Sequence, residues 1–259
     1  MTKKSPIRRL IFTVYVIVLI PVTIIVLGSL LSAGDWRTAS RESVGIAPDP
    51  ATTIDAVIQV YAARAYNWRG IFGVHSWIAT KREGADHYKV HQVIGWRIRG
   101  GLPAVVSAPD IPDRQWFGKP PVLLANIRGP QAETLIDDIE AAVESYPYKD
   151  EYRVWPGPNS NTFTAYVARQ VPGMELELPV TAIGKDYLAN DDLLEPAPSG
   201  TGYQVSLFGL LGLLAAKEEG IEINILGLNF GVDPEDMALK LPLIGSIGLG
   251  SKEEKASDD

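Results

Sequence analysis

The residues best placed for chemistry are Ser160 and the asparagines on either side of it. They lie in WPGPNSNTFTAYVARQV (155–171), where a rigid Pro-Gly-Pro turn leads into a helical pattern. Such a turn delivers the Ser160 hydroxyl to the first turn of a helix, where backbone N–H groups are unpaired and the helix dipole is positive. Some hydrolases keep their nucleophile in such a place. Ser and Asn are also preferred N-cap residues, so the sequence leaves a structural interpretation equally open.

The chain has only three histidines, and all lie on or beside two predicted strands. A hairpin of these strands would bring His75 and His91 across from one another, while His87 is expected in solvent. Two histidines with a carboxylate suggest zinc. Because Asp86 is the only acidic neighbour and no HExxH spacing occurs, no metal site is expected. A hydrogen-bonded structural role is the default for each histidine.

Several sequence blocks carry a resemblance to known families. The N-terminal apolar run, GVHSWIAT, HQVIGW, PGPNSNTFTAYV and the closing GLLGLL…INILGLNFGVD together resemble a family of bacterial membrane-anchored proteins known only as a domain of unknown function, from about Ile54 to Leu249. The order of a strand histidine, a polar residue on the next strand and an Asn-x-x-Thr helix start resembles, more distantly, circularly permuted papain-like amidases of the NlpC type. This resemblance implies an α+β fold, in which an N-terminal transmembrane helix is followed by a permuted papain-like domain with an antiparallel sheet packed by helices.

The distant resemblance also implies catalytic roles. The nucleophile position falls on Ser160, the base on His75 and the residue that orients the base on His91. Serine replaces the cysteine of those amidases, so a stabilised thiolate is unavailable and the hydroxyl needs a base to remove its proton.

The surroundings of that serine would complete a cleft. Asn159, or the backbone N–H groups of Ser160 and Asn161, would donate to an oxyanion. Trp77 and Trp155 would line the groove, although packing in the core or in loops is the commoner role for tryptophan.

The N-terminus predicts a membrane anchor. From Leu10 to Leu31 there are 22 residues without a charge, enough to cross a hydrocarbon core that needs about 20. Four basic residues precede this run and Asp35 follows it, so the positive-inside rule predicts a single-pass protein of the cytoplasmic (inner) membrane with its domain in the periplasm. A cleaved signal peptide is the alternative, but its apolar core is normally only about 7–15 residues long.

The chain therefore divides into a basic tail (1–9), an anchor (10–33), a linker (34–52), an α+β domain (53–250) and a charged tail (251–259). Residues 34–259 carry 20 Lys and Arg against 31 Asp and Glu, a net charge of −11 that argues against nucleic acid. Without cysteine there is no thiolate chemistry and no disulfide. No P-loop, GxGxxG or GxSxG occurs, and no cofactor is expected.

Hydrophobic periodicity predicts the elements of the domain. A helix is favoured at 53–64, with a strand as the alternative, and strands are predicted at 71–80, 87–99 and 122–127. Helices are predicted at 131–145 and 162–170.

The segments 203–216 and 221–230 are unusually apolar and are interpreted as the two strands of one hairpin. Core packing of this hairpin is favoured. The alternative is a face that rests on the membrane or on a partner, since exposed apolar patches of this size are rare in monomers.

Two functions follow as hypotheses. The first is a membrane-tethered acyl or amide hydrolase, or acyltransferase, acting on an envelope peptide, glycan or lipid. The second is a non-catalytic envelope module that binds a partner through the cleft or the apolar hairpin. The distance between Ser160 Oγ and a His75 ring nitrogen discriminates between them. The sequence gives neither the substrate nor the oligomeric state.

Overall fold

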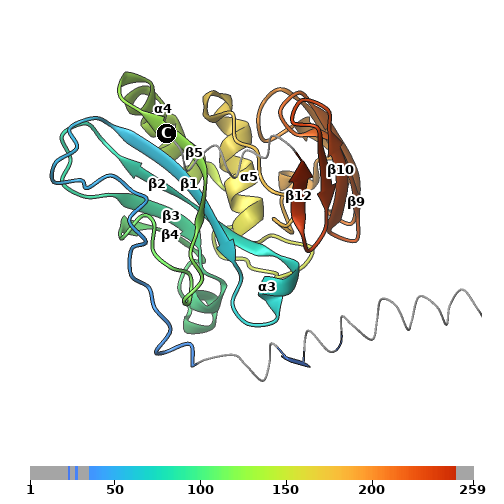
Figure 1. Cartoon of the computed structure of the whole chain (residues 1–259), viewed down its shortest axis with the longest axis horizontal. Coiled ribbons are helices and arrows are strands. Elements are labelled where there is room, and N and C mark those ends of the chain that lie inside the picture. The colour runs from blue at the N-terminus through green and yellow to red at the C-terminus, as the bar shows by residue number, and fades with distance from the viewer. Residues whose placement is uncertain (1–22, 24–26, 29–34, 249–259) are drawn as a thin grey trace, which may run out of the picture.

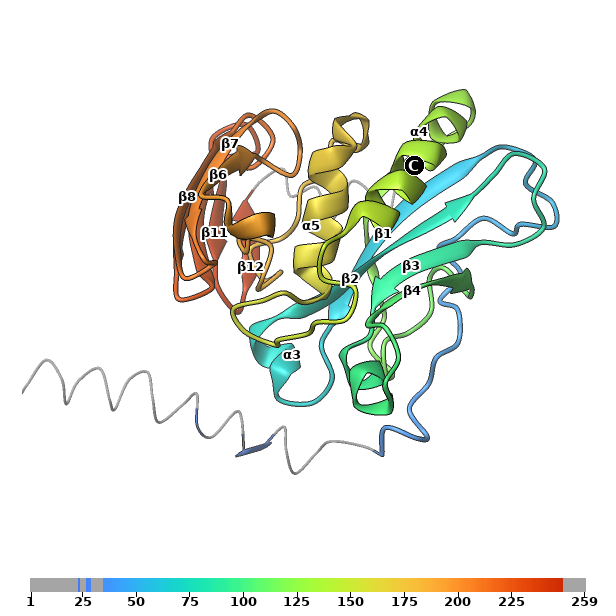
Figure 2. The ribbon, with the colours of Figure 1, turned by 180° about the vertical axis from the view of Figure 1, so that it is seen from behind.

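The chain builds two antiparallel sheets, with helix α5 (Ser160–Gln170) between them and helix α4 (Pro130–Ser145) beside it on the first sheet (Figures 1 and 2). The computed structural model describes residues 23, 27–28 and 35–248. Both views show α4 and α5 covering one face of the first sheet, and the second sheet lying on the far side of α5. The predicted α+β class, with an antiparallel sheet packed by helices, is confirmed at this level, and a second antiparallel sheet adds to it.

The first sheet has five strands in the order β4-β3-β2-β1-β5, and every neighbouring pair is antiparallel. One face packs on the helices around Ile58, Ile78 and Phe163, and the other packs on Trp77 and Trp116 under the N-terminal segment. The strands are β1 (Val57–Arg64), β2 (Val74–Lys81), β3 (Lys89–Val93), β4 (Val105–Pro109) and β5 (Val122–Arg128).

The prediction that favoured a helix at 53–64 is wrong, because the strand given as its alternative is what forms there, as β1. Seven of its eight residues are buried, since β1 lies between β2 and β5 and has both faces covered. A strand buried on both faces carries apolar residues at helix-like spacings as well, so periodicity alone does not separate the two.

The two main helices agree with the sequence prediction. Helix α4 (Pro130–Ser145) buries its apolar stripe, including Ile136 and Ile139, against the first sheet. Helix α5 (Ser160–Gln170) is buried from Ser160 to Arg169, because sheets flank it on both sides.

The second sheet is a seven-stranded meander in the order β12-β11-β10-β9-β8-β7-β6. The single hairpin predicted at 203–216 and 221–230 is wrong, because each segment folds back on itself and supplies two strands. The strands are β6 (Leu194–Pro196), β7 (Gly202–Leu207), β8 (Leu211–Ala216), β9 (Gly220–Ile225), β10 (Leu228–Asp233), β11 (Ala238–Leu241) and β12 (Gly245–Gly248).

Short helical turns connect these elements: α3 (Arg69–Phe72), η2 (Gly95–Gly100), η3 (Pro172–Met174) and η4 (Ala189–Asp191). The predicted anchor at 10–33 falls outside the described residues, apart from residues 23 and 27–28. Within the part of the chain that is described, no helix has the length and apolar character needed to cross a membrane.

Candidate functional site

The predicted oxyanion donor Asn159 is the N-cap of α5. Its side-chain oxygen accepts from the backbone N–H groups of Asn161 (2.9 Å) and Thr162 (3.2 Å), and the Thr162 hydroxyl accepts from the Asn159 N–H in return. The Asn159 amide donates to the carbonyls of Val154 (3.2 Å) and Ile183 (3.0 Å). The side chain of Asn159 and the Asn161 N–H are thus already engaged, and neither is available to an oxyanion.

Asn161 joins this helix start to the first sheet. Its amide donates to the carbonyls of Val74 on β2 (3.0 Å) and Ile183 (2.8 Å), and its oxygen accepts from the Ser76 hydroxyl (2.8 Å). Ser160 lies between the two asparagines and is only 6% exposed. The segment that most resembled a catalytic site therefore forms a buried structural joint between α5 and β2.

The predicted base lies on the other face of the first sheet. Side chains alternate along a strand, and Ser76 is the β2 residue that reaches α5, so His75 points the opposite way. Its ring stacks on Trp116 at 3.7 Å between centroids, and its Nε2 has no hydrogen-bond partner among the described residues. Burial lowers the pKa of His75 to about 3, although a hydrogen bond with Gln92 acts in the other direction.

The residue predicted to orient His75 does not lie beside it either. His91 pairs with Ile78 across β2 and β3, and therefore shares the helix-facing side with Ile78 rather than the side of His75. Its ring nitrogens lie 3.2 Å from Thr80 Oγ1 and 2.8 Å from Ser107 Oγ. Burial, followed by the charge of Lys89, lowers the pKa of His91 to about 4.

The expected convergence of Ser160, His75 and His91 is therefore not found, since the two histidines lie on opposite faces of the sheet. The His75 ring contacts Trp77, Trp116 and Gln92, and the His91 ring contacts Thr80 and Ser107. Neither set of contacts includes Ser160. A general base works best with a pKa near the working pH, and both rings are far below it.

The two tryptophans predicted to line a groove lie apart. Trp77 is buried and donates to the Pro112 carbonyl (2.7 Å), on the side of His75. Trp155 is 50% exposed and donates to the carbonyl of Leu226 (2.9 Å), in the turn between β9 and β10. Among the described residues, no group of three or more His, Asp or Glu is arranged to hold a metal ion.

The most unusual surface of the molecule is the outer side of the second sheet. Cross-strand register places apolar residues opposite one another on this side, as in the row Leu194–Val205–Leu213–Ile223–Phe230. We call this surface the outer apolar face. Its exposed side chains are Leu194, Tyr203, Val205, Leu207, Leu211, Leu213, Ile221, Ile223, Ile225, Phe230, Val232, Leu239 and Ile247.

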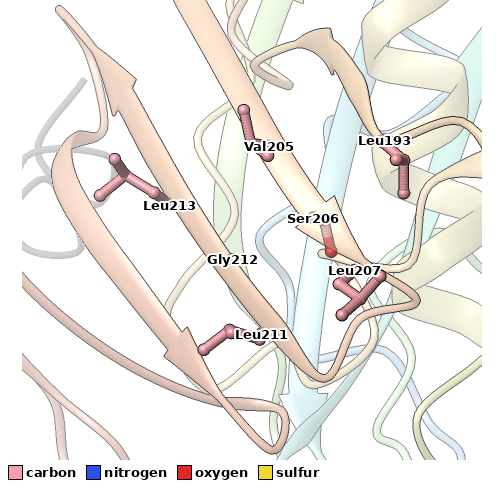
Figure 3. A pocket seen from close by; sticks show the side chains of 7 residues that line it. All are labelled: Leu193, Val205, Ser206, Leu207, Leu211, Gly212 and Leu213. Carbon is pink, nitrogen blue, oxygen red and sulfur yellow. The ribbon is translucent and has the colours of Figure 1, made fainter.

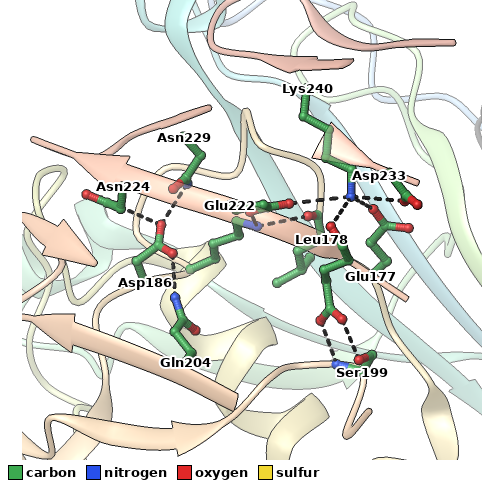
Figure 4. Close-up of polar contacts among 12 residues, drawn as sticks. Glu177, Leu178, Asp186, Ser199, Gln204, Glu222, Asn224, Asn229, Asp233 and Lys240 are labelled. Atoms are coloured by element: carbon green, nitrogen blue, oxygen red, sulfur yellow. Dashed lines mark hydrogen bonds and ion pairs between the residues drawn. The ribbon is translucent and has the colours of Figure 1, made fainter. Parts of the chain in front are cut away.

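The inner side of the same sheet is polar and buried (Figure 4). Asp186 accepts from the amides of Asn224 and Asn229, each at 2.7 Å, and from Gln204. Lys185 pairs with Glu222. Lys240 pairs with Glu177 and lies 3.4 Å from Asp233. Buried charges are stable only when they are paired or hydrogen-bonded, and these contacts fix which side of the sheet faces inward.

The expectation that the apolar segments form core is therefore wrong for the residues that face outward. Leu213 is 50% exposed whereas its neighbour Leu214 is 2% exposed. The sequence of these segments carries a period-2 alternation, but its apolar side faces outward. The signal that could have indicated this is the hydrogen-bonding side chains at the alternate positions Gln204, Ser206 and Glu222.

Two turns extend the outer apolar face at one end of the sheet. Phe208 follows β7 and Leu226 follows β9, and both are exposed. The turns are adjacent, because the Leu226 N–H donates to the Leu210 carbonyl (2.6 Å). We call Phe208–Leu210 and Leu226–Gly227 the apolar turns. A shallow hollow of about 410 Å³ lies next to them, lined by Leu193, Val205, Ser206, Leu207, Leu211, Gly212 and Leu213 (Figure 3).

Comparison with known proteins identifies the family. The family described as "Protein of unknown function (DUF3750)" matches residues 55–187. This span is just over half of the chain, which therefore belongs to that family. It includes the first sheet, α4 and α5, and ends before the second sheet. Neither a curated protein nor a solved structure matches the chain.

Proposed function

We propose that this member of the DUF3750 family is a membrane-anchored envelope protein and a non-catalytic binding or structural module. Its docking surface is the outer apolar face. The observation that supports this proposal is the inverted polarity of the second sheet, whose hydrogen-bonding side chains are buried and whose large apolar side chains are exposed.

The size of the face supports a docking function. Seven strands about 4.8 Å apart span about 29 Å, and five residues of strand span about 17 Å, which gives a footprint of roughly 500 Å². The largest apolar patch on a typical monomer is about 300–600 Å² and is often functional. The apolar turns enlarge the face further.

The predicted active site supports catalysis less well. The hydrogen bonds of Asn159 and Asn161 are used within the joint, and His75 lies on the opposite face of β2. Acyl transfer needs a nucleophile with a base in reach, so docking fits these contacts better than hydrolysis.

Matched substitutions at neighbouring positions test this proposal in the full-length chain. Leu213→Glu adds a charge to the outer apolar face, whereas Leu214→Glu adds the same charge to the interior. We expect Leu214→Glu to prevent folding, because an unpaired buried charge costs several kcal/mol. Leu213→Glu is expected to fold with a thermal midpoint within a few degrees of the wild type.

The docking itself is measured in native membranes. A protease site replaces residues 35–38, which are exposed, and cleavage then frees the domain from the predicted anchor. Wild-type domain should stay with the membrane fraction after cleavage, and the Leu213→Glu domain should be released. Complete release of the wild-type domain, or failure of Leu213→Glu to fold, would contradict the proposal.

A further inference from the structure

Resting on that docking function, we infer that the occupant of the outer apolar face is a lipid bilayer, which the apolar turns enter first. A bilayer interior offers no hydrogen-bonding groups. A surface that enters it must therefore be apolar and must satisfy its backbone within its own sheet.

Backbone strain at the apolar turns is the first support. Phe208 has φ 53° and Leu226 has φ 55°, each followed by a glycine with positive φ. Turns of this kind normally take Asn or Asp before Gly, because bulky side chains are strained in the left-handed region. The chain keeps Phe and Leu at two adjacent tips where Asn would fit better.

The distribution of polar groups is the second support. Protein–protein interfaces have a polar rim and about one hydrogen bond per 100–200 Å². On the outer apolar face only Tyr203 has a side-chain group able to make one. The turns at the opposite end of the sheet carry the exposed charges Lys217 and Glu235 beside an exposed Met237. A polar end and an apolar end match the change from water to hydrocarbon better than they match a second protein.

The short tether is the third support. The apolar run predicted to span the membrane ends at Leu31, and the chain is fixed to the domain from Ser40, whose carbonyl accepts from the Gly118 N–H (2.9 Å). Nine residues span at most about 30 Å. Arg64 Nη2 donates to the Leu243 carbonyl (3.1 Å) and so joins the end of β1 to the turn after β11. In Figures 1 and 2 this end of the second sheet points towards the lower side of the molecule, where the described segment from residue 35 also starts, beneath the first sheet.

The net charge of the domain indicates which lipids are sufficient for binding to the outer apolar face. Residues 34–259 carry a net charge of −11, so anionic headgroups do not attract the domain. Burial of apolar area must then supply the binding energy. Binding to phosphatidylcholine vesicles should therefore be retained at high salt.

The test uses the full-length chain, with the protease site at 35–38, reconstituted in phosphatidylcholine vesicles. The double variant Phe208→Asn/Leu226→Asn removes both apolar tips and relieves the strain. A matched control, Lys217→Asn/Glu235→Asn, changes the opposite end. After cleavage, wild-type and control domains should float with the vesicles, and the tip variant should partition about 30-fold less because two half-exposed apolar side chains are lost. In detergent the tip variant should melt at or above the wild-type temperature.

Other results separate this inference from the docking function. A wild-type domain that leaves phosphatidylcholine vesicles but stays with native membranes would contradict a lipid bilayer as the occupant, and would leave the docking function supported. A domain that leaves both overturns both. A further outcome is efficient disulfide formation between copies that carry Ile223→Cys in dilute vesicles. This outcome would show that a second copy of the chain occupies the face, and would contradict a lipid bilayer as the occupant. A tip variant that floats like the wild type overturns the role of the apolar turns.

Discussion

Replacing Asn159 should destabilise the fold far more than replacing Ser160. Asn159→Ala removes two accepted and two donated hydrogen bonds at a buried position. Loss of an N-cap costs about 0.5–2 kcal/mol. Each of the two donated hydrogen bonds contributes about 0.5–1.5 kcal/mol net, although the Ile183 carbonyl keeps the Asn161 amide as a donor. Since neighbouring groups relax, we expect a total loss of about 3 kcal/mol. For a domain of this size that is a fall in the thermal midpoint of roughly 6–12 °C.

Two further variants separate the parts of this effect. Asn159→Asp keeps the two accepted bonds and loses the two donated ones, so its midpoint should lie between those of the wild type and Asn159→Ala. Ser160→Ala should change stability by no more than about 0.5 kcal/mol, because Ala favours a helix and the N-cap function belongs to Asn159.

The assay is thermal unfolding of the full-length chain in mild detergent, followed by tryptophan fluorescence. A midpoint for Asn159→Ala within 2 °C of the wild type would refute the account of the joint. Covalent labelling of Ser160 by a serine-reactive probe, abolished by Ser160→Ala and by His75→Gln, would refute the assignment of a structural role to this segment.

Two other predictions concern buried ionisable side chains. The pKa values of His75 and His91 are lowered to about 3 and about 4, so the unfolded chain binds more protons below pH 6.5 and stability is lost as the pH falls from 6.5 towards 3. At pH 5 each histidine should cost about 2 kcal/mol relative to pH 7, and thermal midpoints measured at both pH values should differ much less in a His75→Phe/His91→Gln variant. Glu222→Gln leaves Lys185 without its paired carboxylate and should lower the free energy of unfolding by about 3 kcal/mol or more. The control Glu218→Gln, in the β8–β9 turn, should be nearly neutral. Equal thermal midpoints for the two variants would contradict the buried ion pair.

The fold was partly predictable because some segments carry an unambiguous period. Helix α4 has one apolar face and one acidic face, and only a helix buries the first while solvating the second. Strand β1 resembles a helix in its sequence because it is buried on both sides and so carries no polar face to fix its period.

The candidate site could not be derived from the sequence for a different reason. The parity of β2 was clear, with His75 and Ser76 on opposite faces, but which face meets α5 depends on tertiary packing. The pairing of His91 with Ile78 was equally hidden, and a shift of one residue in register moves a side chain to the other face.

The polarity of the second sheet was hidden by the ordinary expectation that apolar residues face inward. The inward direction is set by polar partners far away in the sequence, such as Asp186 for Asn224 and Lys185 for Glu222. Such pairs are apparent only once the chain is folded.

The central claim is that the outer apolar face is in contact with lipid, and Ile223 lies near the middle of it. Because the chain has no cysteine, an environment-sensitive fluorophore on Ile223→Cys reports on one position only. In full-length protein in phosphatidylcholine vesicles, we predict a blue-shifted emission that brominated lipids quench and iodide does not. An emission typical of water, quenched by iodide and unaffected by brominated lipids, would contradict the account.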